Sequence, residues 1–156
     1  MDRAGKALTA GTKRHWAIPG PARATSLQYF AVRDRRSNVA QLLLDHGANL
    51  NTLDKRGRTA LHHASSGGHI NVVAFLLEHG LNVDTRDEDA WTPLYYASRD
   101  GHSNVVQLLL DRGADVNAQV DDRQTALHVA ASRGKFQAVK ALLERGADPL
   151  AHLSSW

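Results

Sequence analysis

Cysteine is absent from the 156-residue sequence. Its absence excludes a disulfide-stapled secreted module, a thiolate metal site and a cysteine nucleophile, since each of them needs this side chain. We therefore expect an intracellular protein, cytoplasmic or alternatively nuclear. Long apolar runs are also missing, because none approaches the roughly 18 residues of a membrane-spanning helix. The N-terminal segment has no apolar stretch like that of a secretory signal, so we expect no membrane span.

Acidic residues are scarce at the N-terminus. Residues 1–36 hold eight Lys or Arg against two Asp, a net +6, whereas the other 120 residues hold eleven against fourteen, a net −3. An acidic body is a poor surface for nucleic acid, so we do not expect that partner for the body. The basic segment keeps a second hypothesis open, in which the N-terminal tail tethers a spacer or regulatory protein to nucleic acid or to an anionic membrane.

A pattern recurs every 33 residues, in residues 59–85, 92–118 and 125–151. A fixed period with many identical positions predicts a repeat architecture. In each unit a threonine that can cap a helix precedes a short helix, which a glycine ends, and a second helix with an apolar stripe follows. The capping threonines are Thr59, Thr92 and Thr125, and the glycines are Gly68, Gly101 and Gly134. One such helix pair cannot cover its own apolar face, so the units must stack.

The pattern TPLxxA…GHxxVVxLLLxxGADVN resembles the ankyrin repeat over roughly residues 26–152. The resemblance implies an all-α repeat solenoid, in which helix pairs stack on one side and β-hairpin-like loops project on the other. The first unit lacks the Thr-Pro start and the glycine that ends the first helix in the other units, so we interpret it as a degenerate N-terminal cap. The predicted repeats are about 23–53, 54–86, 87–119 and 120–152.

The two ends of the array are irregular. Residues 1–22 match no repeat and are predicted to form a flexible basic tail, and residues 153–156 are a C-terminal remnant. The last repeat still offers an apolar stripe, which a terminal repeat normally replaces with polar residues. The stripe consists of Phe136, Val139, Leu142 and Leu143. The chain is accordingly interpreted as a monomer or a weakly self-associating protein, or alternatively as a fragment of a longer repeat protein.

Histidine is abundant, but its positions indicate structure. His62 and His128 stand in the TxLH position and His69 and His102 in the GH position, where the ankyrin resemblance implies histidines that bond to the backbone. A metal site built from His62, His63 and His69 would lack the i, i+4 spacing and the glutamate of zinc proteases. There is no phosphate-binding loop or nucleophile elbow, and paired carboxylates lie in turns. We expect no metal, no cofactor and no enzyme activity.

The resemblance also implies which residues contact a partner, namely those in the turn before each capping threonine and late in the first helix. The predicted partner-binding residues are Arg56, Arg58, Glu88, Asp89, Trp91, Arg99, Asp100, Asp121, Asp122, Gln124 and Arg133. The turns change from basic in the second repeat to acidic in the third and fourth, which would align a partner with opposed charges. We therefore predict a non-catalytic protein–protein interaction module or adaptor that binds an unidentified protein on its concave hairpin and inner-helix face.

Two of the three aromatic residues in the third repeat allow alternative interpretations. Trp91 occupies an exposed turn position, and tryptophan and arginine are common in binding hot spots. Alternatively, Trp91 lies flat across a neighbouring turn and serves stability only. Tyr95 stands where the ankyrin pattern has histidine, so its hydroxyl either replaces a structural hydrogen bond or its ring extends an aromatic patch. Tyr96 is expected to face the core.

Overall fold

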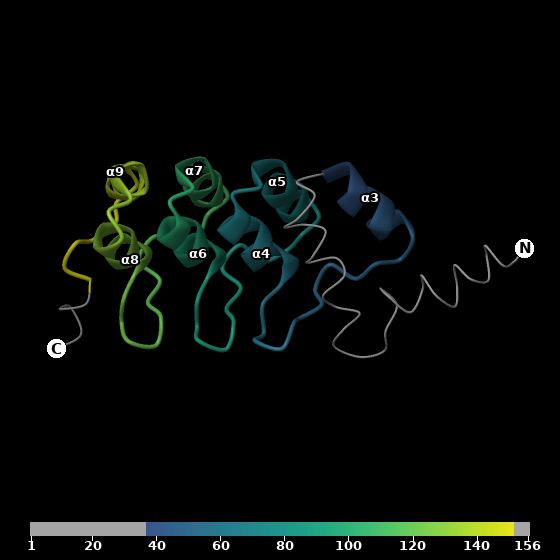
Figure 1. Ribbon diagram of the computed structural model, residues 1–156, viewed down its shortest axis with the longest axis horizontal. Helices are drawn as coiled ribbons and strands as arrows, with labels where there is room; N and C mark the ends of the chain where they lie inside the picture. The colour runs from purple at the N-terminus through teal and green to yellow at the C-terminus, as the bar shows by residue number, and fades with distance from the viewer. Residues whose placement is uncertain (1–36, 152–156) are drawn as a thin grey trace, which may run out of the picture.

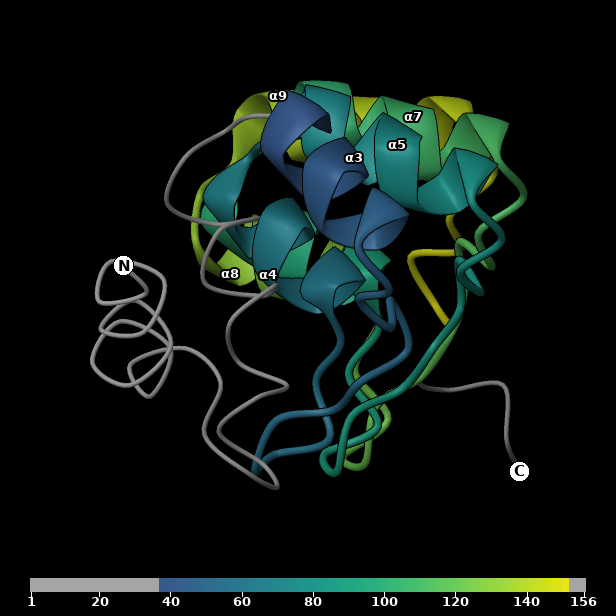
Figure 2. The same ribbon diagram turned by 90° about the vertical axis from the view of Figure 1, so that its right-hand side faces the viewer.

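The computed structural model describes residues 37–151, which form a row of stacked helices with loops projecting from one side (Figure 1). The inner row consists of α4 (Ala60–Gly67), α6 (Pro93–Asp100) and α8 (Ala126–Ser132). The outer row consists of α3 (Ser37–Asp45), α5 (Ile70–Glu78), α7 (Ser103–Asp111) and α9 (Phe136–Glu144). Figure 2, which looks along the row, shows the two helix layers with the loops beneath them.

The described residues contain seven α-helices and no strand, which confirms an all-α repeat solenoid. The predicted basic tail at 1–22, the start of the degenerate first repeat and the remnant at 153–156 lie outside the described residues. Within residues 37–151, no helix is long and apolar enough to cross a membrane.

Each inner helix starts at its predicted threonine. Thr92 accepts a hydrogen bond on Oγ1 from the backbone N–H of Tyr95 (3.2 Å), and Pro93 occupies the first turn, where a missing N–H is harmless. Gly68 ends α4 in the left-handed region at a φ of 72°, and Gly101 ends α6 in the same way. In α8 the cap falls at Arg133, one residue before the predicted glycine.

The core lies between the two helix rows. Leu61, Leu94 and Leu127 occupy the same position of the three inner helices and are at most 6% exposed. They pack against apolar residues of the outer helices, such as Val106 and Leu109, which are both fully buried. Full burial of such a side chain contributes roughly 1.5–3 kcal/mol. The helices therefore form by stacking, because none of them is long enough to be stable alone.

Hydrogen bonds between residues about one repeat apart in sequence also join neighbouring units. Arg86 donates from Nη1 to the carbonyl of Gln119 (2.8 Å), and Gln119 donates from Nε2 to the carbonyl of Ala151 (3.0 Å). The backbone N–H of Asp115 donates to Oδ1 of Asp84 (3.0 Å) in the preceding unit. These bonds fix the start of each loop relative to the start of the next, so the loops keep a regular spacing along the array.

The last repeat exposes part of its apolar stripe. Phe136 is 72% exposed and Leu143 is 47% exposed, whereas Val139 is partly buried. The prediction that Leu142 belongs to this stripe is wrong, since Leu142 is fully buried. Leu142 is the counterpart of Leu109 and points between the two helices of its own repeat, so it needs no following unit to cover it.

Candidate functional site

Three equivalent loops project from the inner helices, at residues 54–58, 87–91 and 120–124. In each loop the backbone N–H of the first residue donates to the carbonyl of the fifth, which closes a tight turn. The closing bonds are Asp54 to Arg58 (3.0 Å), Asp87 to Trp91 (3.1 Å) and Val120 to Gln124 (2.9 Å). The loops are therefore ordered turns, and most of the predicted contact residues lie in them or at the inner-helix ends.

The fourth residue of every loop has a left-handed backbone. Gly57 has a φ of 74°, which glycine adopts without cost. Ala90 and Arg123 take the equivalent positions with φ of 62° and 65°. A side chain in this region costs about 1–2 kcal/mol, so two of the three loops are strained and the closing hydrogen bonds hold them in shape.

A buried carboxylate fixes the loop that carries Trp91. Asp87 is 8% exposed and accepts on Oδ1 from the backbone N–H groups of Asp89 (3.0 Å) and Trp91 (2.9 Å). Its Oδ2 accepts from the hydroxyl of Tyr96 (2.7 Å). Burial and this hydrogen bond raise the pKa of Tyr96 to about 12. Asp87 thus joins loop 87–91 to the side of α6.

Asp54 holds loop 54–58 of the preceding repeat in the same way. Its Oδ1 accepts from the N–H groups of Arg56 (2.8 Å) and Arg58 (3.0 Å), and its Oδ2 accepts from His63 Nε2 (2.9 Å) and Arg58 Nε (2.8 Å). Burial tends to raise the pKa of Asp54, but these hydrogen bonds outweigh it and lower the pKa to about 2. Burial also lowers the pKa of His63, which favours the neutral form of this ring.

The fourth repeat replaces this polar contact with an apolar one. Val120 stands 33 residues after Asp87, and Val129 stands 33 residues after Tyr96. Both valines are 6% exposed and form one small cluster with Tyr95, against which Trp91 packs. Sequence reasoning did not find the bracing carboxylates. The signal that could have found them is the recurrence of Asp at 54 and 87, each nine residues before a ring that can donate a hydrogen bond.

Trp91 is partly buried at the centre of an aromatic cluster. Its ring centroid lies 4.8 Å from that of Tyr95 and 5.3 Å from that of Tyr96. The guanidinium of Arg99 lies over two rings, 5.4 Å from the centroid of Trp91 and 4.9 Å from that of Tyr96. The indole therefore packs on its neighbours and is not fully covered, and a contact between Trp91 and a partner stays a prediction. Tyr96 is buried, as predicted.

Tyr95 partly replaces the histidine of the other repeats. His62 donates from Nε2 to the carbonyl of Trp91 (3.0 Å), 29 residues further along the chain. The hydroxyl of Tyr95 reaches Gln124, also 29 residues further, at a longer 3.5 Å. The ring of Tyr95 has no nitrogen to accept the N–H of Thr92, as His62 does for its own capping threonine. Tyr95 thus retains the contact between repeats, lacks the second bond to the capping threonine and adds its ring to the cluster.

Three of the four histidines in the TxLH and GH positions, His62, His128 and His102, bond to the backbone, as predicted. His62 and His128 accept on Nδ1 from the backbone N–H of their capping threonines, at 3.0 and 3.1 Å. His102 donates from Nε2 to the carbonyl of Ser66 (2.8 Å) in the preceding repeat, and His69 is buried. Among residues 37–151, no three His, Asp or Glu side chains converge as metal ligands.

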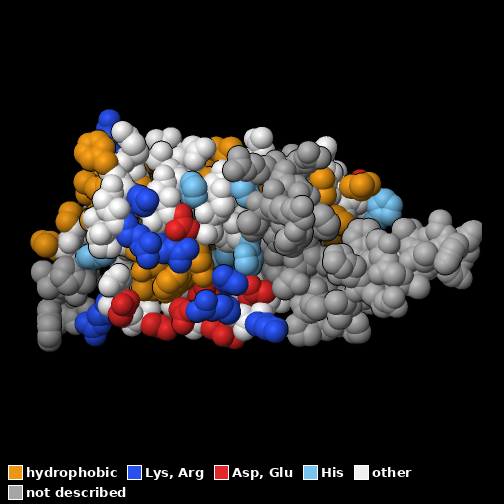
Figure 3. All heavy atoms as spheres, viewed as in Figure 1, with side chains coloured by type: hydrophobic (Ala, Val, Ile, Leu, Met, Phe, Trp, Pro, Cys, Tyr) orange, Lys and Arg blue, Asp and Glu red, His pale blue; other side chains and the backbone are white. Residues whose placement is uncertain are grey.

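The predicted contact residues divide into two groups. The exposed residues are Arg56, Glu88, Asp121, Asp122, Gln124 and Arg133. The partly buried residues are Arg58, Asp89, Trp91, Arg99 and Asp100. On the loop side of the inner helices, Figure 3 shows apolar side chains bordered by basic and acidic ones.

Several residues that were expected only to project are also tied into the scaffold. Arg99 forms a two-bond fork with Asp100, from Nε to Oδ1 (2.9 Å) and from Nη2 to Oδ2 (3.0 Å). Asp100 also accepts from Ser66 Oγ (2.7 Å) in the preceding repeat. Burial tends to raise the pKa of Asp100, but the hydrogen bonds from Arg99 and Ser66 outweigh it and lower the pKa. The charges at this end of α6 are therefore fixed in position.

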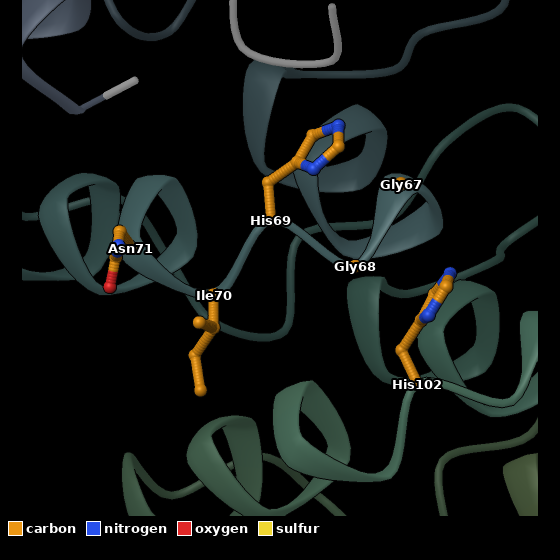
Figure 4. Close-up of a pocket in the computed structure, with 6 residues that line it drawn as sticks. All are labelled: Gly67, Gly68, His69, Ile70, Asn71 and His102. Atoms are coloured by element: carbon orange, nitrogen blue, oxygen red, sulfur yellow. The ribbon is translucent and has the colours of Figure 1, made fainter. Parts of the chain in front are cut away.

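Two of the hollows among the described residues are relevant to the site. The larger, about 350 Å³, lies at the turns between the helix rows and includes His69 and His102 (Figure 4). Its glycines are needed for packing, because a Cβ at Gly67 would lie 2.5 Å from Nε2 of His69 and one at Gly68 would lie 2.6 Å from Nδ1 of His102. The smaller, about 150 Å³, lies beside Trp91 on the loop side and includes several predicted contact residues.

Comparison with known protein families agrees with the repeat architecture. A family model described as ankyrin repeats (3 copies) matches residues 27–120 and again residues 81–152. No curated protein matches the chain. Repeats of this family generally mediate protein–protein interaction and are typically not catalytic. The two matches together cover most of the sequence, and the chain therefore belongs to the ankyrin repeat family.

Proposed function

We propose that this chain is a non-catalytic protein–protein interaction module that holds a protein partner on the concave face formed by its three loops and inner helices. The observation that carries the proposal is the aromatic cluster around Trp91. A partly accessible indole packs against Tyr95, Tyr96 and Arg99, and Asp87 accepts a hydrogen bond from the backbone N–H of Trp91. Anchors of this kind dominate interface energetics, because little conformational entropy is lost when they bind.

The charges around the cluster support the same function. Loop 54–58 presents exposed Lys55 and Arg56, whereas loop 120–124 presents exposed Asp121 and Asp122. A partner with acidic groups at one end and basic groups at the other would fit in one orientation only. A partner of standard size would cover about 800 Å² of this surface. The lack of cysteine in the chain favours an intracellular partner.

The ionisable groups of the concave face support binding better than catalysis. Asp54 and Asp87 have their oxygens occupied by loop N–H groups and by His63 or Tyr96. Asp121 and Asp122 are exposed side chains of a turn. The hydroxyl of Ser66 donates to Asp100 and that of Tyr96 donates to Asp87. Both hydroxyls and both carboxylates thus take part in bonds that hold the scaffold, which favours a non-catalytic role.

Affinity capture tests the proposal. The full chain is immobilised, incubated with a native extract of its own cells, and the retained proteins are quantified by mass spectrometry. We expect the Trp91→Ala, Arg99→Ala double variant to retain the specific partners about tenfold less than wild type. The matched control is Gln107→Ala with Arg112→Ala, two exposed residues of the outer row at α7, which should leave the partners unchanged.

A second variant guards against loss of folding. Asp121→Asn with Asp122→Asn alters only exposed side chains and should weaken the same partners. Circular dichroism confirms that each variant is folded. If both concave-face variants are folded and retain the same proteins as wild type, the proposed function is wrong.

A further inference from the structure

The smaller hollow, about 150 Å³, lies between the second and third repeats. Its wall includes three arginines, Arg56 and Arg58 from loop 54–58 and Arg99 from α6, together with Trp91. No acidic residue is among the described residues that line it. We propose that this pocket binds an anionic side chain of the partner, a carboxylate or a phosphate group. The assignment of this group to a protein rests on the proposed function.

Arg99 is positioned for such a ligand before the ligand arrives. Its fork to Asp100 uses two N–H groups of the five that a guanidinium carries. Asp100 in turn accepts a hydrogen bond from the hydroxyl of Ser66 (2.7 Å). The guanidinium carbon of Arg99 lies 5.4 Å from the ring centroid of Trp91 and 4.9 Å from that of Tyr96. An entering anion therefore meets an ordered donor, so little side-chain entropy is lost on binding.

The other two arginines differ in how firmly they are held. Arg58 donates from Nε to Asp54 Oδ2 (2.8 Å) and is partly buried. Arg56 is exposed, with its Nη2 3.6 Å from Asp89 Oδ2 in the next loop. An exposed pair at that distance is worth little, so Arg56 can turn toward an anion at low cost. The carboxylates that pair with the three arginines are those of Asp54, Asp89 and Asp100. None of them is among the residues that line the pocket.

Carboxylate and phosphate share the acceptor oxygens that guanidinium groups bind by paired hydrogen bonds. A long polyanion fits this surface less well than a single anionic side chain. Its further phosphates would meet Glu88 in the next loop and Asp121 and Asp122 in the loop after that, all three exposed. These carboxylates and the phosphates have like charges and would repel each other. The indole of Trp91 supplies an apolar wall for the part of the side chain that carries the anion.

Nuclear magnetic resonance tests the proposal on the full chain labelled with ¹⁵N. The probes are sodium phosphate, N-acetyl-phosphotyrosine and N-acetylglutamate, with sodium chloride at matched ionic strength as reference. We expect saturable shifts of the Trp91 indole N–H and the Arg99 Nε–H, with dissociation constants in the millimolar range. Tighter binding of the phosphate compounds would identify a phosphorylated partner, and tighter binding of N-acetylglutamate an unmodified acidic one.

Two variants and a control decide the outcome. Arg99→Lys keeps the charge but loses the fork, and should weaken binding about tenfold. Arg56→Gln changes an exposed side chain and should weaken binding severalfold, so it carries the test if Arg99→Lys does not fold. Arg112→Gln on the outer row removes the same charge as Arg56→Gln and should bind as wild type.

Three results would overturn the inference. The first is shifts that do not saturate or that chloride reproduces, and the second is wild-type binding by both pocket variants. The third is a single-stranded oligonucleotide that binds more tightly than phosphotyrosine and depends on the same arginines, because it would assign the pocket to nucleic acid. Each of these results would exclude the anion pocket without deciding whether the concave face binds a protein. The affinity-capture experiment with the Trp91 and Asp121 variants tests that proposed function separately.

Discussion

His62 of the second repeat donates a hydrogen bond from Nε2 to the backbone carbonyl of Trp91 in the third, over 3.0 Å. Because a carbonyl can only accept, Nε2 carries the proton. Nδ1 is then free of hydrogen and accepts from the N–H of Thr59 at 3.0 Å. One neutral imidazole therefore caps α4 and positions the loop that carries the central aromatic residue of the proposed binding face.

Replacement of His62 should destabilise the whole array. His62 is fully buried, and His62→Ala removes the cap, the bond to Trp91 and the volume of the ring. We expect the free energy of unfolding in urea to fall by about 3 kcal/mol. His128→Ala removes the equivalent cap in the last repeat, where the ring is partly exposed, and should cost about 1 kcal/mol. Equal losses for the two variants would contradict the importance of the bond to Trp91.

Stability should depend on pH through the same histidine. Burial lowers the pKa of His62 below its ordinary 6.5, and burial also lowers that of His63. The unfolded chain then binds more protons than the folded one just below pH 6.5. The stabilisation that comes from a neutral His62 is therefore complete above that pH and is lost as the pH falls toward the folded-state pKa. Urea unfolding from about pH 8 to pH 5.5 measures the slope. His62→Gln should reduce it, and a wild-type stability that rises toward pH 5.5 would oppose the assignment.

The left-handed loop positions predict stabilising substitutions. Ala90→Gly and Arg123→Gly relieve backbone strain at φ of 62° and 65° and should each raise the free energy of unfolding by roughly 0.5–1 kcal/mol. Gly57→Ala is the matched control. It should destabilise the chain, because it adds strain and places a Cβ 3.3 Å from Glu88 Cγ. A melting temperature that drops for both glycine variants would show that the loops are not strained.

The apolar contact of the fourth repeat provides a template for testing the polar one. Asp54→Val alone leaves the N–H groups of Arg56 and Arg58 without their acceptor and should cost about 2–3 kcal/mol. Asp54→Val with His63→Val reproduces the pair formed by Val120 and Val129. The double variant should therefore lose about 1 kcal/mol less than the sum of the two single variants. Additive losses in the double-mutant cycle would mean that Asp54 and His63 act independently.

The exposed end of the last repeat should produce weak self-association. Phe136 is 72% exposed and Leu150 is 60% exposed, and an apolar patch of this kind favours contact with another molecule. Sedimentation velocity at rising concentration should show an average mass above that of the monomer. Phe136→Ser, which copies Ser103 at the equivalent position of the third repeat, should restore the monomer. A wild type that is monomeric at all concentrations would contradict the prediction.

The sequence predicted the features that recur along it. The 33-residue period located the helices, and the threonine and glycine positions predicted most helix ends, because capping depends on local backbone geometry. Contacts between neighbouring repeats could not be predicted in this way. Arg99 and Asp100 are adjacent in sequence and look like solvated charges, yet Ser66 of the preceding repeat fixes them. Leu142 was assigned to the exposed stripe because periodicity does not say which side of a helix its own partner covers.

The closing hydrogen bonds of the three loops join the backbone of the first residue to that of the fifth, and do not involve the side chains at the loop tips. The side chains of Lys55, Glu88 and Asp121 are exposed and take no part in the turn closures. Residues at these tips can therefore be exchanged for others with little effect on folding. Selectivity for new targets could be engineered or could evolve at the tips, one residue at a time, while the supporting helices stay unchanged.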